Sequence, residues 1–86
     1  MPRICEFYGV VVYMYYNDHE PPHFHVRYGG YHAKVGIDQV HVIDGQLPPR
    51  TSRMVLEWAA EHQPELRENW RLARAKRALS LVNPVR

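Results

Sequence analysis

Two adjacent glycines, Gly29 and Gly30, separate two runs in which apolar and polar side chains alternate. A two-residue glycine turn is a strong hairpin signal, because the tightest β-turns need a positive φ that glycine adopts at little cost. The alternation also fixes the register, since a slip of one residue would turn every apolar side chain to the wrong face. The expected pairs are Tyr28 with Tyr31, Arg27 with His32, Val26 with Ala33, His25 with Lys34, Phe24 with Val35, and His23 with Gly36.

A strand-rich part, residues 1–45, precedes a helical part, residues 49–78. The segment VVVYMYY at 10–16 is β-branched and aromatic, which is typical of a buried strand, and prolines in the following turn end it. Runs of strands followed by runs of helices favour an α+β domain. We therefore expect a single domain, residues 1–86, in which an antiparallel meander of about four strands carries two C-terminal helices on its apolar face.

Two amphipathic patterns define the expected helices. Pro48 and Pro49 suit a helix N-terminus, where Thr51 or Ser52 is placed to cap the first turn. Pro64 divides the pattern, because proline ends one helix and is well tolerated in the first turn of the next. The apolar stripes expected to pack on the sheet are Met54, Val55, Trp58, Ala59 and His62 in the first helix, and Leu66, Trp70 and Ala73 in the second.

Three histidines lie close together at His19, His23 and His25. His23 and His25 point to the same face of a strand, and two imidazoles on one face can share a tetrahedral zinc ion. Spacing fixes only these two ligands and no CxxC or HExxH motif is present, so our first expectation is a chain without a metal or other cofactor. The alternative is a zinc site that comprises His19, His23 and His25. Other choices for the third ligand are Asp18, Glu20 and His41.

The polar face of the hairpin gathers cationic and hydrogen-bonding side chains. Such residues bind phosphate, and tyrosine rings can stack on unpaired bases. Residues 64–86 carry six basic and two acidic side chains, a balance of +4 in a chain whose net charge is +2. The polar face of the hairpin and the basic C-terminal segment would also fit ordinary solvent-exposed surfaces. The residues expected to contact nucleic acid are His32 and Lys34 on the sheet and Arg67, Arg71 and Arg74 on the second helix.

Metal-independent cleavage of RNA is the catalytic version of this hypothesis. The reaction needs a base, an acid and a cation for the charge that develops on phosphate. Histidine titrates near neutral pH and serves as base or acid, while arginine supplies the cation. We therefore assign catalysis to His23, His25 and Arg27. The alternative is a module without catalysis that binds a protein partner or a divalent metal through the same face.

Composition favours an ordinary cytoplasmic protein. Cys5 is the only cysteine, so no disulfide forms within the chain and no oxidising compartment is required. The N-terminus lacks the apolar core of a secretory signal, and the longest apolar stretch is far too short to cross a membrane. An exposed edge strand would permit a homodimer through strand pairing.

Two long segments carry a resemblance to a known family. FYGVVVYMYYNDHEPPHFHV, residues 7–26, and VLEWAAEHQPELRENWRLAR, residues 55–74, resemble the prokaryotic family named domain of unknown function 4160, and HEPPHFHV is the most specific part. Its members are often encoded beside another family, domain of unknown function 2442, and such pairs are suspected toxin–antitoxin modules. The resemblance therefore implies a toxin-like component with a cognate protein partner, and the histidine-rich face adds the expectation that it binds and cleaves RNA. The motif positions that the resemblance marks as a functional hairpin are His19, Pro21, Pro22, His23, Phe24 and His25.

Overall fold

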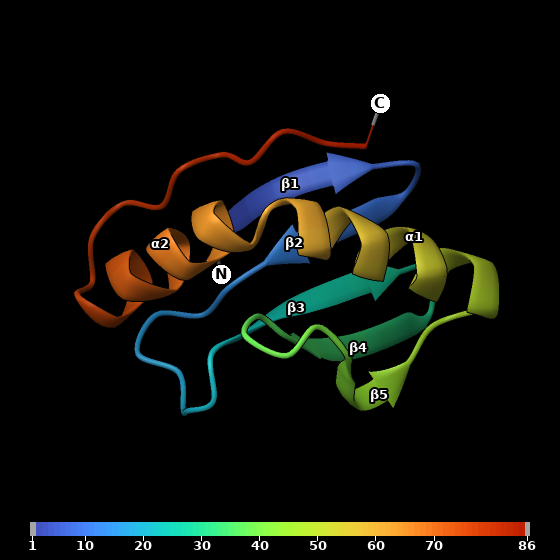
Figure 1. Cartoon of the computed structure of the whole chain (residues 1–86), viewed down its shortest axis with the longest axis horizontal. Helices are drawn as coiled ribbons and strands as arrows, with labels where there is room; N and C mark the ends of the chain where they lie inside the picture. The colour runs from blue at the N-terminus through green and yellow to red at the C-terminus, as the bar shows by residue number, and fades with distance from the viewer. Residues whose placement is uncertain (1, 86) are drawn as a thin grey trace.

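The computed structural model of the chain describes residues 2–85 and contains a five-stranded antiparallel sheet followed by two helices (Figure 1). The strands lie in the sheet in their chain order, which makes the sheet a meander. The predicted α+β architecture is confirmed, with one strand more than the sequence suggested. The ends of the predicted domain, Met1 and Arg86, lie outside the described residues. The elements are β1 Arg3–Phe7, β2 Val10–Tyr13, β3 His23–Tyr28, β4 Tyr31–Gly36, β5 Val42–Gln46, α1 Pro49–Glu61 and α2 Gln63–Arg74.

The β3–β4 hairpin has the register that the sequence predicts, with all six expected pairs present. Gly29 in its turn has a φ of 56°, a left-handed conformation that a side chain disfavours. The connection between β4 and β5 closes with a hydrogen bond from the amide of Gly36 to the carbonyl of His41 at 2.9 Å. A bulge between Lys34 and Val35 then shifts the pairing of β4 with β5 by one residue.

β2 is shorter than the predicted strand. The expectation of a strand through Tyr16 is wrong in its last three residues, because the chain leaves the sheet after Tyr13 and turns at Asn17, whose φ is 60°. Tyr15 is 43% exposed outside the strand. The residues that leave the sheet form a long loop, residues 14–22, which leads into β3.

Both helices cover the same face of the sheet and lie in front of the strands in Figure 1. The expected caps at Thr51 and Ser52 are wrong, because the helix starts earlier, at Pro49, and Thr51 is buried within it. Pro48 is the residue before the first turn, and it makes no side-chain cap. Pro64 lies in the first turn of α2, as predicted. Residues 2–85 contain no helix with both the length and the apolar character that are needed to span a membrane.

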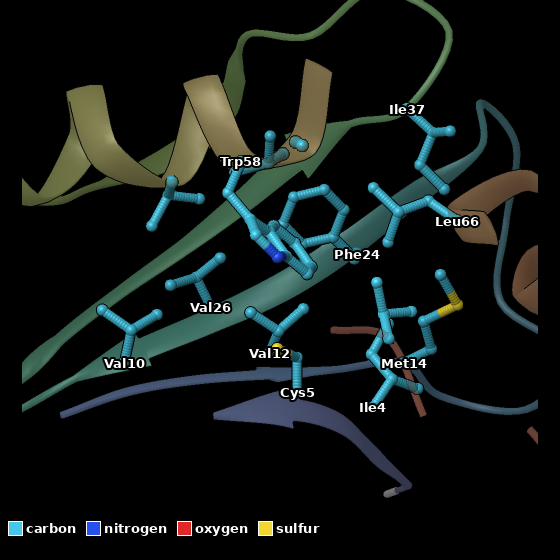
Figure 2. Close-up of a cluster of buried hydrophobic side chains, with 14 of the residues drawn as sticks. Ile4, Cys5, Val10, Val12, Met14, Phe24, Val26, Ile37, Trp58 and Leu66 are labelled. Carbon is cyan, nitrogen blue, oxygen red and sulfur yellow. The ribbon is translucent and has the colours of Figure 1, made fainter. Parts of the chain in front are cut away.

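A single apolar core fills the space between the helices and the sheet (Figure 2). Phe24 on β3 is fully buried, and its ring meets the ring of Trp58 on α1 edge to face at 5.9 Å. Truncating such a phenylalanine to alanine costs roughly 3–5 kcal/mol. Of the predicted helix stripes, Val55, Trp58, Ala59, Leu66, Trp70 and Ala73 are buried. The sheet face turned toward the helices therefore supplies the stability, and the opposite face is available for a site.

The segment after α2 runs back along β1 (Figure 1). The amide of Val82 donates to the carbonyl of Ile4 at 2.8 Å, so the tail lies against the outer edge of the sheet. Asn69 on α2 holds the start of this segment by exchanging two hydrogen bonds with the backbone of Ser80, at 2.7 and 2.8 Å. These contacts cover the β1 edge, whereas the other edge strand, β5, is exposed along most of its length.

Candidate functional site

The loop between β2 and β3 is fastened to the end of α2. The amide of Asn17 donates to the carbonyl of Ala73 at 3.3 Å, and Nη1 of Arg74 donates to Oε2 of Glu20 at 3.0 Å. Figure 1 shows this loop at the α2 end of the molecule. The two contacts hold the loop beside the start of β3 and bring one of its acidic side chains to the strand histidines.

Asp18, His23 and His25 form a compact group. Nε2 of His23 lies 3.0 Å from Oδ2 of Asp18, and Nε2 of His25 lies 3.1 Å from the same oxygen. The other carboxylate oxygen, Oδ1, accepts a hydrogen bond from the amide of His19 at 2.8 Å, which leaves Oδ2 directed at the imidazoles. One ligand atom from each residue of the group lies within 4.8 Å of the others, close enough for all three to bind one metal ion.

The hydrogen bonds of His23 fix its tautomer. Nδ1 lies 2.8 Å from the carbonyl oxygen of Pro21, and because a carbonyl oxygen only accepts, Nδ1 carries the proton and donates it. The lone pair of the neutral ring is then on Nε2, which faces the carboxylate of Asp18. Two acceptors at this distance repel unless a cation, a proton or a metal ion, lies between them. Metal-bound histidines commonly have this arrangement, with the second nitrogen bonded to a backbone carbonyl.

His25 lies between two tyrosine rings. Its ring stacks on Tyr13 with centroids 5.3 Å apart, and Tyr15 meets it edge to face at 4.7 Å. Nδ1 of His25 is buried and has no hydrogen-bond partner among residues 2–85. Burial lowers the pKa of His25, and the hydrogen bond with Asp18 only partly offsets this effect. The ring is therefore neutral near pH 7, which is the form that binds a metal.

Asp18 completes the donor set as a carboxylate. Burial would raise its pKa, but the hydrogen bonds from His25 and from the amide of His19, together with the attraction of His23 in its protonated form, hold the pKa below its usual value. Two imidazoles and one carboxylate suit Zn²⁺ and Fe²⁺. A set of three protein ligands also leaves a coordination position for water or a substrate.

The structure brings together part of the predicted histidine group. His23 and His25 lie in it, as their spacing indicated, and Asp18 is the third member from among the choices that the sequence left open. His19 contributes its backbone amide, while its side chain is exposed and outside the group. His41 bonds through Nδ1 to a carbonyl of its own turn and is also outside it.

The two predicted cationic surfaces differ in their surroundings. On the sheet, Arg27 and His32 are exposed and lie opposite each other, and the half-buried Lys34 lies opposite His25. On α2, each arginine of the stripe has a carboxylate partner, so much of its charge is neutralised. These pairs are Arg67 with Asp38 at 2.7 Å, Arg71 with Glu68 at 2.6 Å and Arg74 with Glu20 at 3.0 Å.

Sequence reasoning missed the aromatic neighbours of the site, Tyr13 and Tyr15. Tyr13 lies directly opposite His25 in the β2–β3 pairing. The alternation within 10–16 places Tyr13 and Tyr15 on one face, but only the length of the following loop fixes which β3 residue they meet. That loop has no tight-turn signal from which its register could be counted.

Comparisons with known proteins place the chain in a family. Neither a curated protein nor a solved structure matches it. Residues 9–71 match the family described as Domain of unknown function (DUF4160), a span that contains Asp18, His23 and His25. Since this span is more than half of the 86 residues, the chain belongs to that family of unknown function.

Proposed function

We propose that the chain is a divalent-metal-binding domain whose centre is formed by Asp18, His23 and His25. The observation that carries the proposal is the hydrogen bond from Nδ1 of His23 to Pro21, which leaves the Nε2 lone pair facing a carboxylate oxygen. A metal ion at this point would replace a repulsion between two acceptors with two metal–ligand bonds. Nε2 of His25, which is directed at the same oxygen, supplies the third ligand.

The burial of the histidines favours ligands over an acid–base pair. A metal-independent ribonuclease needs ring nitrogens that are free to take up and deliver a proton. His23 and His25 are only 3% and 6% exposed, and one nitrogen of each faces Asp18. Their second nitrogens are bonded to a carbonyl in His23 and buried in His25. Metal binding is therefore the function that the geometry supports best.

The experiment is a titration of untagged protein with Zn²⁺ by calorimetry, and with Co²⁺ by visible absorption, which reports the ligand geometry. We expect one ion per chain. Asp18→Asn keeps the shape of the side chain and removes its charge, so affinity should fall by more than the roughly 10–100-fold that losing an outer-shell partner costs. His25→Gln should act in the same direction.

His41→Gln is the matched control, because it removes a histidine of the same molecule that lies outside the group. Its affinity for Zn²⁺ should equal that of the wild type. Circular dichroism of each variant separates loss of a ligand from loss of the fold. Failure of the wild type to bind either ion, or binding that Asp18→Asn and His25→Gln leave intact, would show that the cation between His23 and Asp18 is a proton.

A further inference from the structure

The sheet face opposite the helices continues from the proposed metal centre as an aromatic and cationic surface. His25 belongs to both, because its Nε2 faces Asp18 and its ring contacts the neighbours on the sheet. The ring of Tyr13 stacks on it at 5.3 Å, and the ring of His32 on β4 lies 5.6 Å away. The guanidinium of Arg27 lies 6.0 Å from the centre of the Tyr13 ring.

The charge on this surface is positive next to the metal centre. Arg27 makes no ion pair among residues 2–85, and His32 lies opposite it in the β3–β4 pairing. The nearby carboxylate of Glu6, in the same row of the sheet, is already bonded to Arg3 at 2.7 Å. Within the described part of the chain, Arg27 is therefore a cation without a carboxylate partner, two residues along the strand from the proposed metal ligand His25.

Tyr15 adds an exposed aromatic ring at the edge of this surface. It is 43% exposed, and its ring meets His25 edge to face at 4.7 Å, which fixes the position of the ring while leaving part of it open to solvent. Such a ring can stack on an unpaired nucleobase, because every base has a π-face. A free phosphate ion has no π-face and would not stack on this ring.

We infer that this surface binds single-stranded nucleic acid, with one phosphate group at the open position of the metal centre and a neighbouring phosphate at Arg27 and His32. The inference rests on the proposed metal centre, and it adds the class of ligand. A nucleic-acid strand repeats its phosphates, so it can occupy the metal and Arg27 together while a base stacks on Tyr15. Each of these three contacts has a separate variant that removes it.

The test measures binding of a fluorescently labelled single-stranded RNA, and of DNA of the same sequence, by anisotropy. Wild-type protein is compared with and without Zn²⁺, over a series of salt concentrations. We expect Zn²⁺ to strengthen binding of the strand. Arg27→Gln should make the slope of log K against log salt shallower by about 0.7, the value for one phosphate contact on a single strand. Tyr15→Ala should weaken binding roughly tenfold.

Arg53→Gln is the matched control, because it removes the same charge from an exposed position on α1, on the other side of the sheet. It should leave the binding of the strand close to that of the wild type. The Zn²⁺ affinities of Arg27→Gln and Tyr15→Ala should also be unchanged, which keeps the two proposals separable. Asp18→Asn should abolish the effect of Zn²⁺ on binding, even though the loss of a negative charge by itself favours an anionic strand.

Several outcomes would overturn the inference. If Zn²⁺ binds but does not strengthen binding of either strand, or if Arg27→Gln behaves like Arg53→Gln, the metal centre stands and the nucleic-acid surface fails. If the wild type takes up no Zn²⁺ and still binds the strand, the metal centre fails. The part of the inference that places a phosphate at the metal then fails with it. Displacement of the strand by an equal concentration of inorganic phosphate or of polyglutamate would assign the surface to a simple anion or to an acidic peptide.

Discussion

The histidine group at the start of β3 and the arginine stripe on α2 look alike in the sequence and differ in the structure. Each is a set of basic side chains at the spacing of one face of its element. Two of the histidines converge with Asp18 on one point, where three ligand atoms lie within 4.8 Å of one another. The three arginines diverge, and each binds a different carboxylate.

The difference shows that a shared face is not enough to make a site. On the strand, a loop tied to another element brings a carboxylate over the histidines and holds it there. On the helix, the arginines of the stripe are exposed to solvent, and each long side chain pairs with a carboxylate within its reach. Exposed pairs of this kind contribute little to stability. We therefore expect changes in the histidine group to have larger effects than changes in the stripe.

The largest contrast should appear in cells. The family resemblance predicts a toxin-like protein, so expression of the chain by itself should stop growth and reduce colony formation to background. Asp18→Asn should restore growth, because it removes a proposed ligand, whereas Arg71→Gln should remain toxic. Growth of cells that express the wild type would contradict the toxin prediction. Arrest by Asp18→Asn at the same protein level would separate toxicity from the metal centre.

Thermal unfolding should give the next largest contrast. An ion at one hundred times its Kd stabilises the folded state by about 2.7 kcal/mol, which raises the Tm of a domain of this size by roughly 10–20 °C. We expect this rise for the wild type and for Arg67→Gln when Zn²⁺ replaces EDTA, and none for Asp18→Asn. A rise in Asp18→Asn as large as that in the wild type would place the ion elsewhere.

These two regions also show what the sequence can predict. The β3–β4 register follows from alternation and a glycine turn, both local, and every pair is correct. The placement of His23 and His25 on the same face of β3 follows from their spacing, which is also local. The approach of Asp18 is not, because it depends on contacts between the 14–22 loop and α2. The ion pairs of the arginines are also non-local, because the partners of Arg67 and Arg74 lie 29 and 54 residues away in the sequence.

Arg74 links the two regions, and its substitution should have an intermediate effect. Its bond to Glu20 helps to hold the loop that carries Asp18, so Arg74→Gln should weaken Zn²⁺ binding by up to roughly fivefold, the worth of an exposed ion pair. The effect is limited because the backbone bond from Asn17 to Ala73 remains. Calorimetric titration at low and high salt checks it, since salt should shrink the difference.

Arg71→Gln is the control for Arg74, because it removes the same charge from the same helix without touching the loop. Its Zn²⁺ affinity should match the wild type. Equal affinities for Arg74→Gln and the wild type would mean that the loop holds Asp18 in place without the ion pair.

The smallest effect should come from Arg71 itself, through the pH dependence of stability. The hydrogen bond from Arg71 lowers the pKa of Glu68, and both side chains are exposed on successive turns of α2. A carboxyl whose pKa is lower in the folded state stabilises that state above its unfolded pKa, and the contribution is lost as the pH falls through the folded pKa. The Tm difference between wild type and Arg71→Gln should therefore be slight at pH 7 and should disappear as the pH falls through the lowered pKa of Glu68 in the folded state. A double-mutant cycle with Glu68→Gln isolates this pair, and its coupling should fade with added salt. The coupling between Arg71 and Glu68 at pH 7 should be much smaller than the stabilisation by Zn²⁺ that Asp18→Asn removes. If the two were equal, the arginine stripe would be more than a row of surface ion pairs.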